Sequence, residues 1–373
     1  MNKKEHTHLV LLDAHAILHR AYHALPDFSS SKGEPTGALY GFISMILAIA
    51  EELKPDAIAA CYDLPGGTFR HEAYDAYKGG RKEAEGDLIM QMGTSRFVCD
   101  ALGIPMYDAP SFEADDILGT IVEQVKNKDV VVTIASGDMD TLQLVEGDRV
   151  RVFTMRKGIK DIVLYNEEAV RERFGFAPEA LIDYKGLRGD PSDNIPGVRG
   201  IGEKSATELI VAYGSLEKIF DALDQDGAEE VIKKSGAKKR MIDLLIAGRN
   251  DAEFSKTLAT IRRDAPVTYE LPEQSWTTSV SSEKIRELVS RFEFRSLLPR
   301  LERLFTEAEL SPASHTSSSN MPTLSDREIQ ELAIGVWLLN SELTHPGEAE
   351  ILEYTGEHNI LKARDIILDH LNE

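Results

Sequence analysis

The stretch SFEADDILG, residues 111–119, places three carboxylates within four residues at the predicted start of a helix. Acidic side chains in a first turn favour the helix dipole, and Ser111 is able to cap the helix, so a purely structural explanation is available. On a helical wheel Glu113, Asp115 and Asp116 all lie opposite the apolar arc. This polar face fits either solvent or a cleft that holds cations.

Further carboxylates stand where predicted buried strands end. They are Asp13 in the strand at 8–14, Asp63 in the strand at 57–63, and Asp138 and Asp140 after the strand at 130–136. Ligands of open parallel sheets bind beyond the carboxyl ends of the strands, so we expect these side chains at one rim. The loop RGDPSDNIPGV adds Asp190 and Asp193.

Nine ionised carboxylates cannot stay close together without cations, because their charges repel. The set offers only oxygen ligands, with no convincing histidine or cysteine cluster, and this favours hard ions such as Mg²⁺ or Mn²⁺. Two such ions about 4 Å apart suit in-line phosphoryl transfer. The sequence therefore predicts a centre for two divalent cations, with the ligands Asp13, Asp63, Glu113, Asp115, Asp116, Asp138, Asp140, Asp190 and Asp193.

Basic residues concentrate in the segment that follows the predicted strand at 57–63. Residues 69–87 contain Arg70, Lys78, Arg81 and Lys82, with Tyr77 among them. Positive charges beside an acidic rim could stabilise a scissile phosphate, and Tyr77 could stack on a base or simply pack. Arg20 is another candidate phosphate contact, whereas His15, His19 and His23, at i, i+4 and i+8, are interpreted as a helix surface rather than metal ligands.

A second candidate nucleic-acid element is the stretch NIPGVRGIGEKSATELI. Gly200, Ile201 and Gly202 form a predicted tight hairpin just before a helix, where backbone N–H groups can hold a phosphate and Lys204 adds a charge. With Gly197 before it and Ser205 after it, the pattern is typical of a helix–hairpin–helix that binds a DNA backbone without reading its sequence. An ordinary joint between two helices is the alternative.

Composition sets limits on these interpretations. The net charge of −21 argues against a nucleic-acid partner unless the acids are solvated surface or cluster around divalent cations. Two cysteines fit a reduced interior, and neither a secretory signal nor a run of about 18 apolar residues is present, so we expect a cytoplasmic monomer without membrane association.

The alternation of strands and helices predicts an α/β fold, with a mostly parallel central sheet and helices on both faces. We expect an α/β core with the metal site at 1–170, a helical region with the helix–hairpin–helix at 171–304, a flexible linker at 305–323 that is rich in Ser, Thr and Pro, and a small helical tail at 324–373.

Taken together, these segments resemble the 5′-nuclease domain of bacterial DNA polymerase I, in the flap-endonuclease superfamily. The matching stretches include LLDAHAILHRAYHA, TFRHEAYDAYKGGR, FEADDILGT, SGDMDTLQLV and DYKGLRGDPSDNIPGVRGIGEKSA, in family order over roughly residues 7–304. The resemblance implies the PIN-like 5′-nuclease fold and a two-ion site made by the nine acids. It also implies that Lys78 and Arg81 act on the phosphate, and that the hairpin binds duplex DNA with a monovalent K⁺.

The implied substrates are 5′ flaps, nicks and free 5′ ends of duplex DNA, cut in replication primer removal and repair. Departures from the family are Ala14-His15-Ala16 after the first Asp, and Lys82-Glu83 after Arg81. The tail resembles a helical piece of a proofreading exonuclease domain but lacks that domain's Asp-x-Glu nuclease motif. We interpret it as a vestige of that domain or as a docking element. Two alternative functions stay open: a non-catalytic DNA-binding module, and a nuclease that prefers the RNA of RNA–DNA hybrids, as in primer removal. The chain could also be either a standalone nuclease that works with a separate polymerase or the N-terminal fragment of a longer polymerase.

Overall fold

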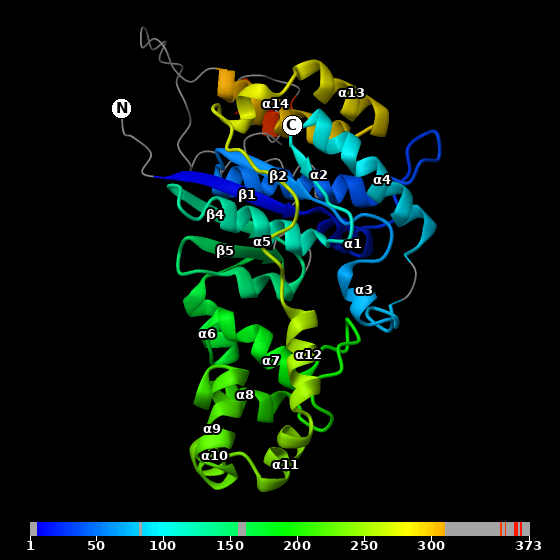
Figure 1. Ribbon diagram of the computed structural model, residues 1–373. Coiled ribbons are helices and arrows are strands. Elements are labelled where there is room, and N and C mark those ends of the chain that lie inside the picture. The colour runs from blue at the N-terminus through cyan, green and yellow to red at the C-terminus, as the bar shows by residue number, and fades with distance from the viewer. Residues whose placement is uncertain are drawn as a thin grey trace. The chain divides into compact units, whose positions relative to one another are not determined.

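The central feature of the fold is one sheet with the strand order β3-β2-β1-β4-β5-β6 (Figure 1). The computed structural model describes residues 6–81, 84–155 and 162–309, and residues 351, 352, 355, 362–364, 366 and 367 of the tail. The strands in these residues are β1 (Thr7–Asp13), β2 (Ala57–Cys61), β3 (Met106–Tyr107), β4 (Val130–Ala135), β5 (Val150–Met155) and β6 (Ile162–Tyr165). Only the β5–β6 pair among them is antiparallel. The mostly parallel sheet is thus confirmed, and β6 is an edge strand that the sequence patterns did not reveal.

Strand β1 is buried on both of its faces. Leu9 and Leu11 belong to the core that contains α5 (Ala114–Gln124), whereas Val10 and Leu12 belong to the core on the opposite face. That second core also contains residues of α1 (Ala14–Ala24), α2 (Gly37–Leu53), α4 (Gly86–Ala101), α13 (Ser282–Phe292) and α14 (Leu298–Glu309). Because both faces are covered, the strand reads as a continuous apolar run, and polar groups collect at its carboxyl end.

A stack of helices follows β6 and lies beyond β5 in Figure 1. Its members are α6 (Glu167–Phe174), α7 (Leu181–Arg188), α8 (Glu203–Tyr213), α9 (Leu216–Gln225), α10 (Ala228–Ser235), α11 (Lys239–Ala247) and α12 (Arg249–Ala259). In it, α7 packs closely on α12, and the backbone N–H of Gly197 donates to Ser255 Oγ on α12 over 2.9 Å. Residues Met1–Ser311 form one compact unit, so the sheet and these helices belong to a single body.

The last helix of this unit, α14, extends beyond the predicted start of the linker. The linker was expected to begin at residue 305, but α14 continues to Glu309. Leu301 and Phe305 are 1% and 6% exposed and pack in the second core, which keeps the helix intact. Residues 310–350, including the rest of the expected linker, lie outside the described part of the chain, and the boundary at residue 170 stays a prediction. Among the residues that are described, none of the helices combines the length and hydropathy that a membrane span needs.

Gly119 of α5 provides a test of the packing behind the carboxylates. A Cβ at Gly119 would lie 2.8 Å from both the carbonyl oxygen of Arg262 and a methyl of Ile261. Gly119→Ala should therefore lower the free energy of unfolding by about 1–3 kcal/mol, because backbone must shift to admit the methyl group. At the exposed Gly93 of α4 no atom lies within 4 Å, so Gly93→Ala should stabilise the protein by about 0.5–1 kcal/mol. Urea unfolding of both variants checks this, and equal effects would refute the packing described.

Candidate metal-binding active site

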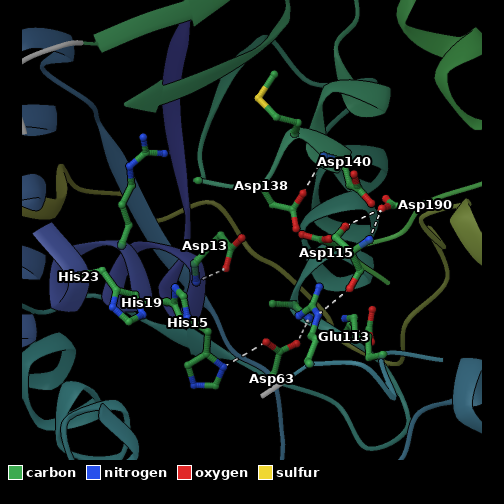
Figure 2. Close-up of a pocket in the computed structure, with 18 of the residues that line it drawn as sticks. Asp13, His15, His19, His23, Asp63, Glu113, Asp115, Asp138, Asp140 and Asp190 are labelled. Atoms are coloured by element: carbon green, nitrogen blue, oxygen red, sulfur yellow. Dashed lines mark hydrogen bonds and ion pairs between the residues drawn. The ribbon is translucent and has the colours of Figure 1, made fainter. Parts of the chain in front are cut away.

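A pocket of about 1350 Å³ opens at the carboxyl edge of the sheet (Figure 2). It is larger than the roughly 300–1,000 Å³ of a typical small-molecule site. Seven of the nine predicted acids line it, and these are Asp13, Asp63, Glu113, Asp115, Asp138, Asp140 and Asp190. They follow β1, β2, β4 and α7 or begin α5, so segments far apart in the sequence supply them. The expectation of one acidic rim describes these seven residues well.

Asp13 ends β1 and is only 4% exposed. One carboxylate oxygen accepts the N–H of Ala16 at 3.1 Å and thereby caps α1, and the other accepts the hydroxyl of Ser136 at 2.7 Å. Burial raises the pKa of Asp13 to about 7, with repulsion from Asp63 and Asp138 adding to the effect and the Ser136 hydrogen bond opposing it. Burial and the neighbouring carboxylates therefore disfavour the ionised form of Asp13, which a cation in the pocket would stabilise.

The ionised forms of Asp115 and Asp140 are disfavoured in the same way. Burial, followed by repulsion from Asp138, Asp13 and Asp140, raises the pKa of Asp115 well above its usual range. Burial also raises the pKa of Asp140 to about 7, although Lys185 acts against the shift. Carboxyl groups whose ionisation is disfavoured by one another are stabilised as anions by a cation placed between them.

Lys185 is a pocket residue that the sequence reasoning missed. Its ammonium group forms ion pairs with Asp140 and with Asp190, the latter at 2.5 Å. Burial disfavours the ionised form of Asp190, but these contacts with Lys185 and hydrogen bonds from Ser192 hold its pKa at about 2. The signal was present in the sequence as a lysine five residues before Asp190, but that spacing does not show that the side chain turns back to the rim.

Lys78 and Arg81 reach the same pocket from the segment after α3 (Phe69–Ala73). The Nζ of Lys78 lies 2.8 Å from a carboxylate oxygen of Glu113, and Arg81 forms an ion pair with Asp193. Lys78 adopts a positive φ of 55°, an uncommon conformation for a lysine. Both cations thus lie where the sequence analysis expected them.

Asp116 occupies a different environment from the other acids of SFEADDILG. It is fully buried, does not line the pocket, and binds the Arg70 guanidinium through both oxygens at 2.8 Å. It also accepts the backbone N–H groups of Glu113 and Arg262. Since these contacts saturate its oxygens, we correct Asp116 from a metal ligand to an anchor for the start of α5, where Glu113 rather than Ser111 is the N-cap.

Asp193 is likewise 7% exposed and absent from the pocket lining. Its carboxylate pairs with Arg81 and lies 3.1 Å from the hydroxyl of Tyr77. Tyr77 is only 3% exposed, and its hydroxyl is also 3.1 Å from Glu113. We therefore correct the expectation that Tyr77 contacts DNA, because its ring is enclosed and its hydroxyl holds two carboxylates in place.

Arg70 also has a structural role. It was expected to contact DNA, but it is 3% exposed. In addition to Asp116 it donates to Glu113 and to the carbonyl oxygens of Leu258 and Thr260, the two carbonyls each at 2.9 Å. Arg70 therefore joins α3, the start of α5 and the end of α12.

The hairpin residues divide into exposed and buried groups. Gly200, Gly202 and Lys204 are exposed and Ser205 is half-buried, whereas Gly197 and Ile201 are buried. Gly197 has a φ of +61°, and a Cβ there would lie 2.2 Å from the backbone nitrogen of Gly189. We therefore interpret Gly197 and Ile201 as residues that shape the hairpin rather than contact DNA. Lys82 lies outside the described residues.

Three histidines of α1 line the pocket, together with Arg20. The sequence analysis interpreted the three histidines only as a helix surface, and Arg20 as a candidate phosphate contact. His15 Nδ1 lies 3.1 Å from a carboxylate oxygen of Asp63. Burial disfavours ionisation of Asp63, but this contact and the N–H of Ala114 hold its pKa below the usual value.

The residues at the rim fit divalent cations by their chemistry. Their donors are carboxylate oxygens, and three of the acids have raised pKa values. Within the described part of the chain, no group of three or more acidic, histidine or cysteine side chains is arranged closely enough to enclose an ion as it stands. Ion pairs with Lys78 and Lys185 draw several of these oxygens toward the protein's own cations.

Removal of Arg70 should be strongly destabilising. Arg70→Ala leaves Asp116 buried without a counter-ion, and the expected loss in the free energy of unfolding is about 3–5 kcal/mol. The matched control is Arg171→Ala, which breaks the exposed 2.8 Å pair with Glu167 and should cost less than about 1 kcal/mol. Urea unfolding measures both variants. If Arg70→Ala lost no more unfolding free energy than the control, the two-bond contact of Arg70 with Asp116, here called the Arg70–Asp116 clamp, would not be structural.

The raised pKa of Asp13 predicts a pH-dependent stability of the metal-free protein. The folded state holds the Asp13 proton up to about pH 7, but the unfolded chain releases it near pH 4. This contribution to stability is therefore complete below about pH 4 and is lost as the pH rises to about 7. Asp13→Asn, which cannot ionise, should gain on the order of 2 kcal/mol relative to wild type between pH 5 and pH 8. Chemical unfolding in EDTA at the two pH values tests this, and a constant difference would contradict it.

Two family profiles match the chain in succession. The first, described as 5′-3′ exonuclease, N-terminal resolvase-like domain, matches residues 8–175. The second, described as 5′-3′ exonuclease, C-terminal SAM fold, matches residues 176–282. Between them they cover the sheet from residue 8 on, the acidic rim and the whole helical stack.

Full-length relatives and a solved structure agree with these profiles. DNA polymerase I of Bacillus caldotenax is 38% identical over 324 residues, covering 87% of this chain and 35% of the relative. DNA polymerase I of Caldicellulosiruptor bescii is 40% identical over 294 residues, covering 79% and 33%. The chain thus spans about a third of the length of these relatives. A bacteriophage T5 flap endonuclease, solved with DNA and metal ions, has the same fold, with a TM-score of 0.56, 19% identity, and coverage of 81% of this chain and 99% of that one. The chain belongs to the 5′-3′ exonuclease family.

Proposed function

We propose that this chain is a divalent-metal-dependent 5′-3′ exonuclease and flap endonuclease. Its substrates are 5′ flaps, nicks and free 5′ ends of duplex DNA. The reaction is the hydrolysis of a phosphodiester bond. The observation that carries the proposal is the pocket in which seven carboxylates meet Lys78 and Arg81, in a chain that belongs to this nuclease family. DNA and metal ions are also present in the structure of the T5 flap endonuclease with the same fold.

Two Mg²⁺ or Mn²⁺ ions are the proposed cofactors, held by the seven carboxylates that line the pocket. When bound, such ions act as Lewis acids on a phosphate and lower the pKa of water. The chain's own contribution is to hold the oxygens ready: Ser136 fixes Asp13, and the Arg70–Asp116 clamp fixes the turn that carries Glu113 and Asp115. Binding requires the Lys185 ion pairs with Asp140 and Asp190 to rearrange.

Lys78 and Arg81 are the proposed phosphate-contacting residues of the reaction. Both line the pocket, where Lys78 is paired with the pocket acid Glu113 and Arg81 is held by Asp193 behind the pocket. Their charges would stabilise the negative charge that develops on the phosphate during attack. Burial disfavours the charged form of Lys78, but Glu113 and Asp193 raise its pKa, so it stays cationic at neutral pH.

The exposed hairpin around Gly200 and Gly202 is the proposed contact with the duplex. It precedes α8, whose N-cap is Gly202 and has no side-chain acceptor for the first N–H groups of the helix. Such N–H groups and the positive end of the helix suit a backbone phosphate, and Lys204, with an exposed side chain, adds a charge. A K⁺ ion on the hairpin carbonyls is part of this proposal, as is a cytoplasmic monomer.

Cleavage of a 5′-labelled flap tests the proposal directly. With Mg²⁺ or Mn²⁺ the wild type should release the flap, and matched DNA and RNA 5′ ends will show which is preferred. The double variant Asp115→Asn/Asp138→Asn should bind the flap but cut it at least about 100-fold more slowly. Asp221→Asn, an exposed acid of α9 away from the pocket, is the control and should cut at the wild-type rate. Wild-type protein that binds the flap and leaves it intact would instead identify a non-catalytic DNA-binding module.

A further inference from the structure

A concentrated basic surface stands out in this acidic chain. The net charge is −21, yet residues 233–240 carry five positive charges and no carboxylate. We call this surface the basic turn, and it consists of Lys233, Lys234, Lys238, Lys239 and Arg240. All five are exposed, and the turn joins α10 to α11. It was not part of the site predicted from the sequence.

Three of the five charges of the basic turn have neither an ion pair nor a cation–π contact among the described residues. Lys233 lies 3.5 Å from Glu230, and the Nζ of Lys234 lies 4.0 Å from the ring centre of Tyr213. Among the ion pairs of the described residues, none involves Lys238, Lys239 or Arg240. Their mutual repulsion is therefore not relieved from within, which suits an external anion.

The backbone of the turn adds to the positive potential and fixes its shape. Lys238 is the N-cap of the nine-residue helix α11 and offers no side-chain acceptor, so the first N–H groups of that helix have no cap. Gly236 ends α10 with a φ of +73°, and Ser235 Oγ accepts the N–H of Ala237 at 3.2 Å. The charges are thus presented on a defined turn.

Helix α11 connects the basic turn to the hairpin. A Cβ at Gly200 would lie 3.0 Å from Leu244 of α11, and a Cβ at Gly248 would lie 2.7 Å from Val198. Lys239 precedes Leu244 by five residues, a rise of about 7.5 Å along the helix. Successive phosphates of one DNA strand advance by about 3.4 Å along the duplex axis, so this rise equals roughly two base-pair steps for a duplex that runs along α11.

We propose that the basic turn is a second contact with the phosphate backbone of the duplex that the hairpin binds. This inference rests on the proposed function, because it takes its ligand to be the same DNA. The contact is made by Lys238, Lys239 and Arg240 and does not depend on base sequence. It lengthens the footprint on the duplex arm and leaves the chemistry of the pocket unchanged.

The salt dependence of DNA binding tests the contact. Fluorescence anisotropy in EDTA, which prevents cleavage, should be measured with a labelled flap substrate over a range of KCl concentrations. Lys238→Ala/Lys239→Ala should weaken binding, and should reduce the slope of log K against log[salt] by about 1.8, since each lost phosphate contact removes about 0.9. The control Lys126→Ala/Lys128→Ala removes two exposed lysines just before the amino end of β4, whereas the pocket lies at the carboxyl ends of the strands, and should leave the slope unchanged.

The length of the duplex arm provides the second readout. The effect of Lys238→Ala/Lys239→Ala should be present with a duplex arm of two turns, and should shrink when that arm is cut to about 5 bp, half a helical turn. The inference would be overturned if wild type and Lys238→Ala/Lys239→Ala had equal salt slopes. It would also be overturned if the control Lys126→Ala/Lys128→Ala lost as much affinity as Lys238→Ala/Lys239→Ala, and in both cases the proposed function would stand. Wild-type protein that binds no duplex would instead overturn the proposed function.

Discussion

Repulsion between carboxylates is the constraint on which the rest of this structure depends. Three parallel strands end in or near aspartates at one edge of the sheet, and α5 begins there with three more acids. Burial and mutual repulsion raise the pKa of Asp13, Asp115 and Asp140, so the cluster is held together against its own charge. Such an arrangement costs stability, and proteins tolerate that cost where the charges serve a reaction.

The acids of this rim have two separate roles. Asp116 and Asp193 are enclosed and paired with Arg70 and Arg81, and they fix the segments that carry the other acids. The other seven acids line the pocket, although Asp13 and Glu113 among them are as buried as Asp193. Arg70 also binds two carbonyls at the end of α12, which is hydrogen-bonded to the hairpin segment through Ser255 and Gly197. Through these bonds the candidate active site and the candidate duplex contact are parts of one framework.

The sequence was sufficient to predict the sheet and its acidic rim, because a strand buried on both faces is a continuous apolar run and its end is marked by aspartate. It was not sufficient to predict which acid meets which base. Arg70 and Asp116 are 46 residues apart, and Lys185 meets Asp140 across 45, so only the tertiary fold pairs them. For the same reason the burial of Gly197 was missed and the choice between stacking and packing for Tyr77 stayed open, since a motif shows residue types but not which side chains the fold encloses.

The most direct test of the central claim, that the rim holds two divalent cations, is a crystal structure of the protein soaked with Mn²⁺ and measured at the manganese absorption edge. The expected result is two anomalous peaks about 4 Å apart, both within ligand distance of the pocket carboxylates, with Lys185 released from Asp140. Asp116 should keep both of its contacts with Arg70 and should ligate neither ion. A map without peaks in the pocket, with Lys185 and Lys78 still paired to their acids, would contradict a two-ion nuclease site.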